Sequence, residues 1–224
     1  MFSEFRSEFM GLVDYSQAYE KQKNIWERVL QNNSYSVILG LEHPEVITLG
    51  RRATEAEVFN KTASIVQSTR GGLATLHSEG QLVIYPILHV RSYFCGVRNY
   101  VTELLLVTQT VLEKYYSIQS TIDESNAGLY TAEGKIAFCG IEIKSGVSLH
   151  GLSINLNNDL GLFQQIRPCG FQKLKLDRVC YYHTNVQSSD FFQKWITEFK
   201  HRLSQLNPQL NQRLNQRLNQ QFNP

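Results

Sequence analysis

The strongest constraint on the fold is how the spacing of apolar residues changes along the chain. Six short runs rich in β-branched residues predict strands at 36–41, 45–49, 81–88, 127–131, 135–143 and 147–156. Apolar residues at the i, i+3, i+4 spacing predict helices at 15–30 and 97–116, and a last helix that begins near Ser188 or Ser189. Because strands and helices do not alternate regularly, the pattern predicts an α+β fold.

Turn and capping residues give local detail. Asp14 followed by Gln17 is typical of a helix N-terminus. His43-Pro44 separates the first two strand runs by a turn. The run at 81–88 is continuously apolar, which predicts a strand buried on both faces, with Pro86 near its end or at an edge.

The composition changes abruptly at Leu206. From there Leu-Asn-Gln-Arg repeats with a period of four, which drifts by about 40° per repeat against a helix of 3.6 residues per turn. We therefore expect one folded domain in residues 1–205 and a weakly ordered tail in 206–224. A helix that binds a partner is the alternative for the tail.

Charge and composition exclude several classes of protein. The chain has 22 Lys+Arg and 20 Asp+Glu, and the excess lies in Arg213 and Arg217 of the tail, which argues against a basic nucleic-acid-binding surface. No apolar run approaches the roughly 18 residues of a membrane span, and the N-terminus does not resemble a secretory signal. Four dispersed cysteines do not suit a disulfide framework. We expect a reduced, cytoplasmic protein with no nucleic-acid or membrane partner.

Common cofactor motifs are missing. The segment from Gly128 to Lys135 is similar to a phosphate-binding loop, but five residues separate its glycines and Ile136 stands where Ser or Thr is needed. The six histidines are dispersed and no Cys-x-x-Cys or Gly-x-Ser-x-Gly motif occurs. We expect neither a metal nor another cofactor.

Four segments combine reactive side chains with glycine. In Arg70–His77 a glycine pair accompanies a cation, a hydroxyl and an imidazole, although an ordinary turn is favoured for this segment alone. Cys169 lies between Pro168 and Gly170, and is either a nucleophile or a structural thiol. For Lys135, at the start of an apolar strand, a solvated charge is favoured. For His150, before Gly151, the alternative to a functional role is a satisfied core histidine.

Taken in order, these segments resemble the octanoyltransferases of lipoate biosynthesis, the lipoyl(octanoyl) transferase family. The resemblance covers about residues 10 to 172. Its segments are Leu41-Glu42-His43-Pro44, Thr48-Leu49-Gly50-Arg51-Arg52, Arg70-Gly71-Gly72 with Thr75 and His77, Gly80 to Pro86, Gly134-Lys135-Ile136-Ala137, His150-Gly151-Leu152, Asn155, Asp159-Leu160 and Pro168-Cys169-Gly170.

The resemblance implies a mixed sheet flanked by helices, as in the catalytic domain of lipoate and biotin protein ligases. It implies transfer of octanoyl from octanoyl-acyl carrier protein to a lysine of a lipoyl domain, through a thioester on the enzyme. The implied acceptors are the lipoyl domains of 2-oxoacid dehydrogenase complexes and the glycine cleavage H protein.

The resemblance also assigns residues. Cys169 is implied as the nucleophile and Lys135 as its partner, because an amine in an apolar strand can take the thiol proton and later that of the incoming amine. Amides around Gly71-Gly72 or Gly151 are candidate oxyanion donors. The implied acyl pocket consists of Arg70, Gly71, Gly72, Leu73, Ala74, Thr75, Leu76, His77, Phe138, Cys139, Gly140, Gly151, Leu152 and Ser153.

Three departures and two alternatives accompany this assignment. Leu76 stands where the family usually has an aromatic residue, Ser78-Glu79 stands where it has Gly-Pro, and 173–180 replaces a segment that contains Thr-Ser. These departures leave open which acyl chain length is preferred and how the acceptor docks. The alternatives are an ATP-dependent lipoate protein ligase and a non-catalytic relative that binds acyl groups or carrier protein. Because carrier proteins are acidic, a docking patch for them would consist of basic side chains. The candidates are Arg51, Arg52, Lys144, Arg167, Lys173 and Lys175. The alternative for these residues is an ordinary solvated surface.

Overall fold

The structure, a computed structural model, describes residues 4–59, 63–167 and 174–206. Its main sheet has the strand order β1-β2-β6-β10-β9-β8-β7. The strands are β1 (Glu4–Leu12), β2 (Tyr35–Glu42), β6 (Gln81–Ile87), β7 (Thr121–Asp123), β8 (Gly128–Tyr130), β9 (Lys135–Lys144) and β10 (Val147–Asn155). β1 is parallel to β2 and the other neighbours are antiparallel, so the sheet is mixed.

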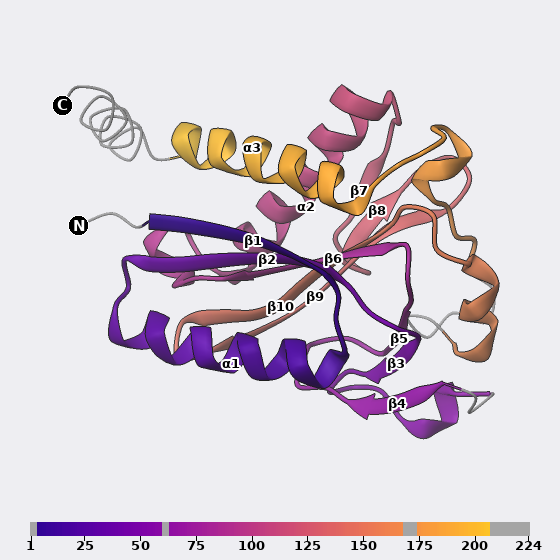
Figure 1. The fold of residues 1–224 in the computed structure, drawn as a ribbon, viewed down its shortest axis with the longest axis horizontal. Coiled ribbons are helices and arrows are strands. Elements are labelled where there is room, and N and C mark those ends of the chain that lie inside the picture. The colour runs from indigo at the N-terminus through magenta and orange to yellow at the C-terminus, as the bar shows by residue number, and fades with distance from the viewer. Residues whose placement is uncertain (1–3, 60–62, 168–173, 207–224) are drawn as a thin grey trace.

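A smaller sheet lies beside the main one (Figure 1). It has the order β4-β3-β5, with β3 at Val46–Leu49, β4 at Ser64–Gln67 and β5 at Ala74–His77. β3 is parallel to β4 and antiparallel to β5. The turn at His43-Pro44 therefore connects β2 and β3, which belong to different sheets and do not pair.

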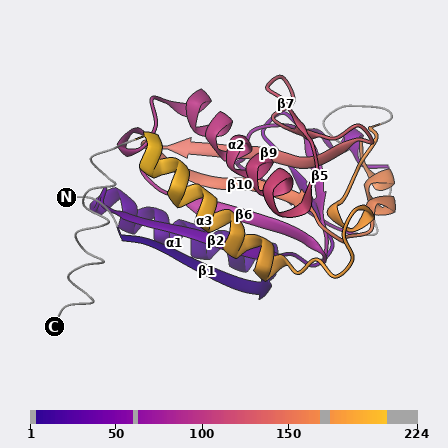
Figure 2. The same ribbon diagram turned by 90° about the horizontal axis from the view of Figure 1, so that it is seen from above.

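The helices cover both faces of the main sheet. Within the described ranges, α1 (Tyr15–Gln31) lies on one face, and α2 (Val97–Tyr116) and α3 (Ser188–Leu206) lie on the other (Figures 1 and 2). Short 3₁₀ turns occur at Glu55–Glu57, Val90–Ser92, Leu160–Gln165 and Val179–Tyr181. The Asp14 side chain caps α1 by accepting a hydrogen bond from the Ser16 amide.

The interface of α2, α3 and the sheet forms the largest apolar cluster. The Trp195 indole is fully buried and donates a hydrogen bond to Thr108 Oγ1 at 2.9 Å. Phe192 packs so closely on β2 that a Cβ at Gly40 would lie 2.5 Å from its ring. Glycine at this strand position thus lets α3 approach the sheet.

The sequence predicted α1, α2, α3 and six of the strands with bounds that agree to within two residues, and the α+β class is confirmed. It did not predict β1, β4, β5 or β7. β1 is an edge strand with Phe5 and Phe9 spaced by four rather than two residues, and β4 and β7 have only four and three residues. Residues 207–224 of the repeat lie outside the described residues.

Replacing Phe192 by alanine removes a fully buried ring from the α3–β2 interface. We expect the free energy of unfolding to fall by about 3–5 kcal/mol, because the substitution loses buried area and leaves a cavity. Gln193→Ala, at the neighbouring exposed position, is the control and costs less than about 0.5 kcal/mol. Urea unfolding followed by circular dichroism measures both, and equal losses would contradict this packing.

Candidate active site

A cavity of about 360 Å³ opens where the small sheet meets β9 and β10. This volume lies at the lower end of the range of about 300–1,000 Å³ that is typical of small-molecule sites. Of the fourteen pocket residues predicted from the sequence, Leu76 is the only one outside the lining. The other residues that line the cavity are Tyr15, Arg52, Val83, Tyr85, Val101, Ser125, Asn126, Ala127, Lys135, Ile141 and His150.

The alternation of side chains along β5 explains the position of Leu76. Thr75 and His77 point to the cavity, whereas Leu76 is completely buried in the apolar cluster of the small sheet with Ile47 and Leu49. The cluster also contains Phe138. Leu76 therefore supports the cavity wall from behind.

Arg70 fixes the glycine loop that precedes β5. Its guanidinium donates hydrogen bonds to the Thr48 carbonyl at 2.6 Å, to Thr48 Oγ1 at 2.8 Å and to the Gly71 carbonyl at 3.0 Å. The Gly71 amide donates to the Ile141 carbonyl at 2.9 Å. Because this amide is already bound, Gly71 is a poor oxyanion donor, which removes one of the candidates predicted from the sequence.

Lys135 is fully buried, so the favoured expectation of a solvated charge was wrong. Its Nζ atom donates a hydrogen bond to the Asn126 carbonyl at 2.7 Å and lies 4.9 Å from the centre of the Phe138 ring. A Cβ at Gly128 would lie 2.4 Å from Lys135 Cε, so only glycine leaves room for this side chain. The amine is thus held between an aromatic ring and a backbone carbonyl.

The described cysteines do not provide a reactive thiolate in the cavity. Cys139 lines the cavity, but burial raises the pKa of its thiol to about 12, although the charge of Lys135 acts in the opposite direction. Cys95, which is exposed, and Cys180, which is half-buried, do not line the cavity. The predicted nucleophile, Cys169, lies outside the described residues.

The described chain that follows Cys169 returns to Lys135. The Lys135 amide donates to the Lys175 carbonyl at 2.9 Å, and the Asp177 amide donates to the Lys135 carbonyl at 3.0 Å. Lys175 is six positions beyond Cys169 in the sequence. The start of β9 is therefore joined directly to the segment that follows the predicted nucleophile.

A buried hydrogen-bond chain orients His77. Its Nδ1 donates to Gln81 Oε1 at 2.7 Å, an assignment that follows because the Gln81 amide nitrogen donates to Asn155 Oδ1 at 2.8 Å. Burial lowers the pKa of His77 to about 3, so the ring is neutral at neutral pH. His77 Nε2 is then a hydrogen-bond acceptor at the wall of the cavity.

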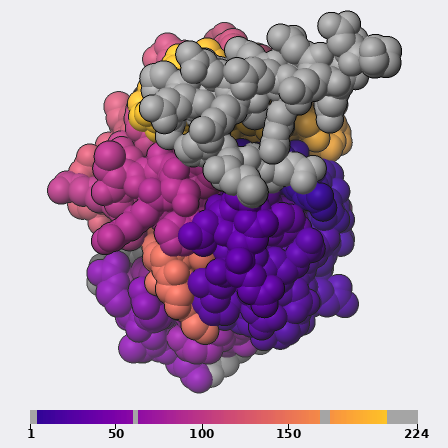
Figure 3. Space-filling model, turned by 90° about the vertical axis from the view of Figure 1, so that its left-hand side faces the viewer, coloured from indigo at the N-terminus to yellow at the C-terminus, as the bar shows by residue number. Residues whose placement is uncertain are grey.

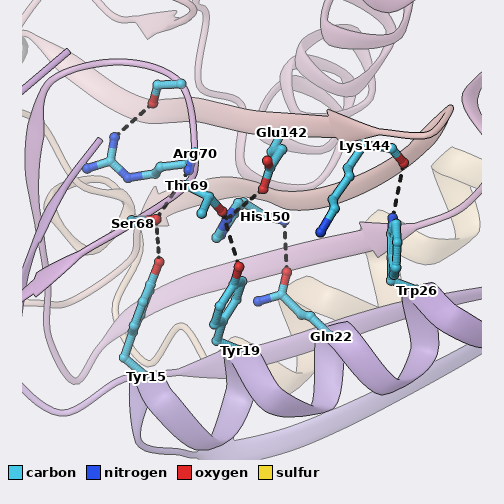
Figure 4. A network of polar contacts seen from close by, with 11 residues as sticks. Tyr15, Tyr19, Gln22, Trp26, Ser68, Thr69, Arg70, Glu142, Lys144 and His150 are labelled. Atoms are coloured by element: carbon cyan, nitrogen blue, oxygen red, sulfur yellow. Dashed lines mark hydrogen bonds and ion pairs between the residues drawn. The ribbon is translucent and has the colours of Figure 1, made fainter. Parts of the chain in front are cut away.

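His150 joins the cavity to α1 (Figure 4). Its amide donates to Gln22 Oε1 at 2.8 Å, its Nε2 lies 3.0 Å from Thr69 Oγ1, and its ring stacks on Tyr19. Among the described residues its buried Nδ1 has no hydrogen-bond partner, so the expectation of a satisfied core histidine holds only in part. His150 also lines the cavity, and burial lowers its pKa to about 3.

The basic residues proposed for docking do not all line the cavity. Arg52 lines it, whereas Lys144 ends β9 three residues beyond Ile141, the last β9 residue of the lining, and its amine lies 4.8 Å from the centre of the Trp26 ring of α1. Figure 3 shows the β9–β10 hairpin at the surface. Lys144 is therefore directed onto α1, and Lys173 lies outside the described residues.

Sequence reasoning missed two parts of the site. Nothing in the sequence pointed to Tyr15 as a cavity residue, because its position indicates only the start of α1. The turn at 125–127 was missed because it lies between two very short strands. Within the described part of the chain, no group of three or more His, Cys, Asp or Glu residues could hold a metal ion. No helix there is both long and apolar enough to span a membrane.

Comparison with known proteins gives a consistent result. The model of the lipoyl protein ligase A/B catalytic domain family matches residues 14–215. An octanoyltransferase of Legionella pneumophila (strain Lens) is 37% identical over 196 residues, which cover 85% of this chain and 98% of that protein.

Solved structures show the same fold. A bipartite lipoate protein ligase from Thermoplasma acidophilum has a TM-score of 0.68 at 12% identity, with 90% of this chain and 84% of that chain covered. A biotin protein ligase from Aquifex aeolicus has a TM-score of 0.55 at 14% identity, with 91% and 72% covered. The mixed sheet of the ligase type predicted from the resemblance is confirmed.

The buried histidines should make the folded chain sensitive to mild acid. Burial lowers the pKa of His43 to about 4 and those of His77 and His150 to about 3, below the ordinary value of 6.5. Between pH 6.5 and about 4 the unfolded chain therefore binds protons that the folded chain does not, and stability falls as the pH falls. Urea unfolding at pH 7.5 and pH 5 should show a lower free energy of unfolding at pH 5.

The variant His77→Gln, with one buried imidazole fewer, should lose less stability between these two pH values. His201→Gln removes an exposed imidazole from α3 and is the matched control, which should keep the full pH dependence. A His77 resonance that titrates near pH 6.5 in the folded chain would contradict the prediction.

Proposed function

Because the chain belongs to the octanoyltransferase family, we propose that it transfers octanoyl from octanoyl-acyl carrier protein to the acceptor lysine of lipoyl domains, through a thioester on Cys169. The observation that carries this proposal is the buried amine of Lys135 at the wall of a partly apolar cavity. The proposed setting is the cytoplasm, and residues 1–205 form the proposed catalytic domain. The lipoyl domains of 2-oxoacid dehydrogenase complexes and the glycine cleavage H protein are the proposed acceptors.

The first half of the reaction acylates the enzyme. Lys135 accepts the proton of the Cys169 thiol, and the thiolate attacks the carbonyl carbon of the octanoyl thioester. The bond between this carbon and the phosphopantetheine sulfur breaks, and the leaving sulfur takes the proton back from Lys135. Octanoyl is then bound to Cys169, and the carrier protein leaves as a thiol.

The second half transfers the acyl group to the acceptor. The neutral acceptor amine attacks the Cys169 thioester, and Lys135 accepts the proton that the nitrogen loses. The carbon–sulfur bond to Cys169 breaks, and Lys135 returns the proton to the thiolate. The products are an octanoyl amide and the original enzyme, so the cycle needs no ATP.

The cavity provides suitable surroundings for this chemistry. Leu73, Val83 and Leu152 contribute apolar surface for the acyl chain. His77 offers its neutral Nε2 as an acceptor. Cys139 is protonated at neutral pH and does not compete as a nucleophile.

A lipoate protein ligase is the second candidate, since the fold is shared with such enzymes. A ligase activates a free acid with ATP and does not need an acyl-enzyme thioester. A non-catalytic relative that only binds acyl groups is the third candidate. Lys135 and Cys169 favour the transferase over this third candidate, because both residues that the proposed transfer needs are present.

Substitution of the proposed dyad tests the mechanism. We expect Cys169→Ser and Lys135→Ala each to lower the transfer rate by at least about 10³-fold, because one loses the nucleophile and the other its proton acceptor. Cys95→Ser, which changes an exposed thiol, should retain the wild-type rate. Mass spectrometry of the wild-type enzyme with octanoyl-acyl carrier protein should locate the acyl group on Cys169, and an adduct on another cysteine would refute the assignment.

The requirement for ATP separates the candidate functions. We expect an octanoylated lipoyl domain to form from octanoyl-acyl carrier protein without ATP. Formation only from free octanoate with ATP would instead identify a ligase. Tight binding of the donor without any product would identify the non-catalytic relative.

A further inference from the structure

The β7–β8 turn is organised around one carboxylate. Asp123 accepts hydrogen bonds from the Ser125 amide at 2.8 Å, the Ser125 hydroxyl at 2.5 Å, the Asn126 amide at 3.2 Å and the Asn126 side-chain amide at 2.9 Å. These bonds lower the pKa of Asp123 to about 2, so the carboxylate is ionised at neutral pH. Four donors on one ionised group make the turn unusually well defined.

The turn presents a backbone carbonyl to the Lys135 amine. Asn126 O accepts the hydrogen bond from Lys135 Nζ at 2.7 Å, and Ser125, Asn126 and Ala127 line the cavity. Ala127 has a φ of 32°, in the left-handed region that non-glycine residues adopt at a cost. The Asp123 bonds hold Ser125 and Asn126, the two residues that directly precede Ala127.

The next residue completes the contact. Gly128 follows the turn and begins β8, and a side chain there would collide with Lys135 Cε and Nζ. The Lys135 side chain therefore crosses the backbone of β8 and ends at the Asn126 carbonyl. Residues 123–128, which we call the lysine turn, bind the end of this side chain.

We propose that Asp123 is a positioning residue, which acts through the Asn126 carbonyl to hold the Lys135 amine at the point where it exchanges protons. This inference rests on the proposed function, since the turn orients Lys135, which is the proton acceptor only in that proposal. Proton transfer requires the two heavy atoms to be within hydrogen-bond distance, and a misplacement of about 1 Å can lower a rate by about 10²-fold. Asp123 itself exchanges no proton in this scheme.

The neighbouring Glu124 provides a matched control within the same turn. Its carboxylate pairs with Arg98 at 2.6 Å, and both side chains are more than half exposed. It carries the same charge as Asp123 but accepts no hydrogen bond from the turn in the described structure. Glu124→Ala therefore removes a negative charge from the turn without changing the bonds that fix Asn126.

The experiment measures kcat and KM for octanoyl transfer by the full-length chain, with octanoyl-acyl carrier protein as donor and a lipoyl domain as acceptor. We expect Asp123→Ala to lower kcat by about 10- to 100-fold with KM within about twofold, because the amine is displaced but the substrate surfaces are unchanged. Asp123→Asn keeps an oxygen acceptor for the Ser125 donors and should restore most of kcat. Glu124→Ala should match the wild type.

A second variant covers the case in which Asp123→Ala does not fold, as judged by circular dichroism. Asn126→Ala removes the side-chain bonds to Asp123 at 2.9 Å and to Ser125 Oγ at 3.2 Å, but keeps the carbonyl and the bond from the Asn126 amide to Asp123, so it should give a smaller fall in kcat. Equal kcat values for Asp123→Ala and Glu124→Ala would overturn the proposal. If Asp123→Ala does not fold, equal kcat values for Asn126→Ala and Glu124→Ala would overturn it instead. So would a failure of Asp123→Asn to restore kcat.

The outcome for the proposed function is separate. If Lys135→Ala stays active, the dyad itself is wrong, whatever the Asp123 variants show. If Lys135→Ala is inactive and Asp123→Ala behaves like the control, only the positioning role is wrong.

Discussion

The burial of the Lys135 amine is the interaction on which the site depends. Placing an ammonium group in a protein interior costs several kcal/mol unless nearby groups replace its water. Here a backbone carbonyl and two aromatic rings surround it, at 2.7 Å from Asn126 O and at 4.9 and 5.3 Å from the centres of the Phe138 and Tyr130 rings. Several otherwise unrelated features follow from this, including the glycine at position 128 and the left-handed residue before it.

The arrangement of two sheets gives the cavity its walls. The glycine loop and β5 come from the small sheet, whereas β9 and β10 come from the large one, and the amide of Gly71 joins them at the Ile141 carbonyl. The chain crosses between the sheets at His43, whose two ring nitrogens bind the Val13 carbonyl and the Tyr85 hydroxyl. Walls made of two hydrogen-bonded sheets favour preorganised binding.

Sequence periodicity was sufficient for the helices and for the long strands, because their apolar residues repeat with the period of the element. The candidate site was predicted from a family resemblance, which did not indicate all of the residues that line the cavity. Leu76 lies within a segment that resembles the family. Because side chains alternate along β5, however, its side chain points away from the cavity. The proposed role of Asn126 depends on its backbone carbonyl. Because every residue type has this group, the amino-acid sequence does not indicate the role.

Arg70 illustrates how a buried structural charge acts at a distance. Its guanidinium is 8% exposed and is fixed by bonds to Thr48 and Gly71. Burial lowers the pKa of His77 and of His150, and the Arg70 charge lowers both further, whereas burial raises the pKa of Tyr15 and of Tyr85 against the effect of this charge. These four side chains come from different elements and all line the cavity. Burial and the charge of Arg70 therefore both disfavour a cation in the cavity, so an amine enters most readily after it has lost its proton.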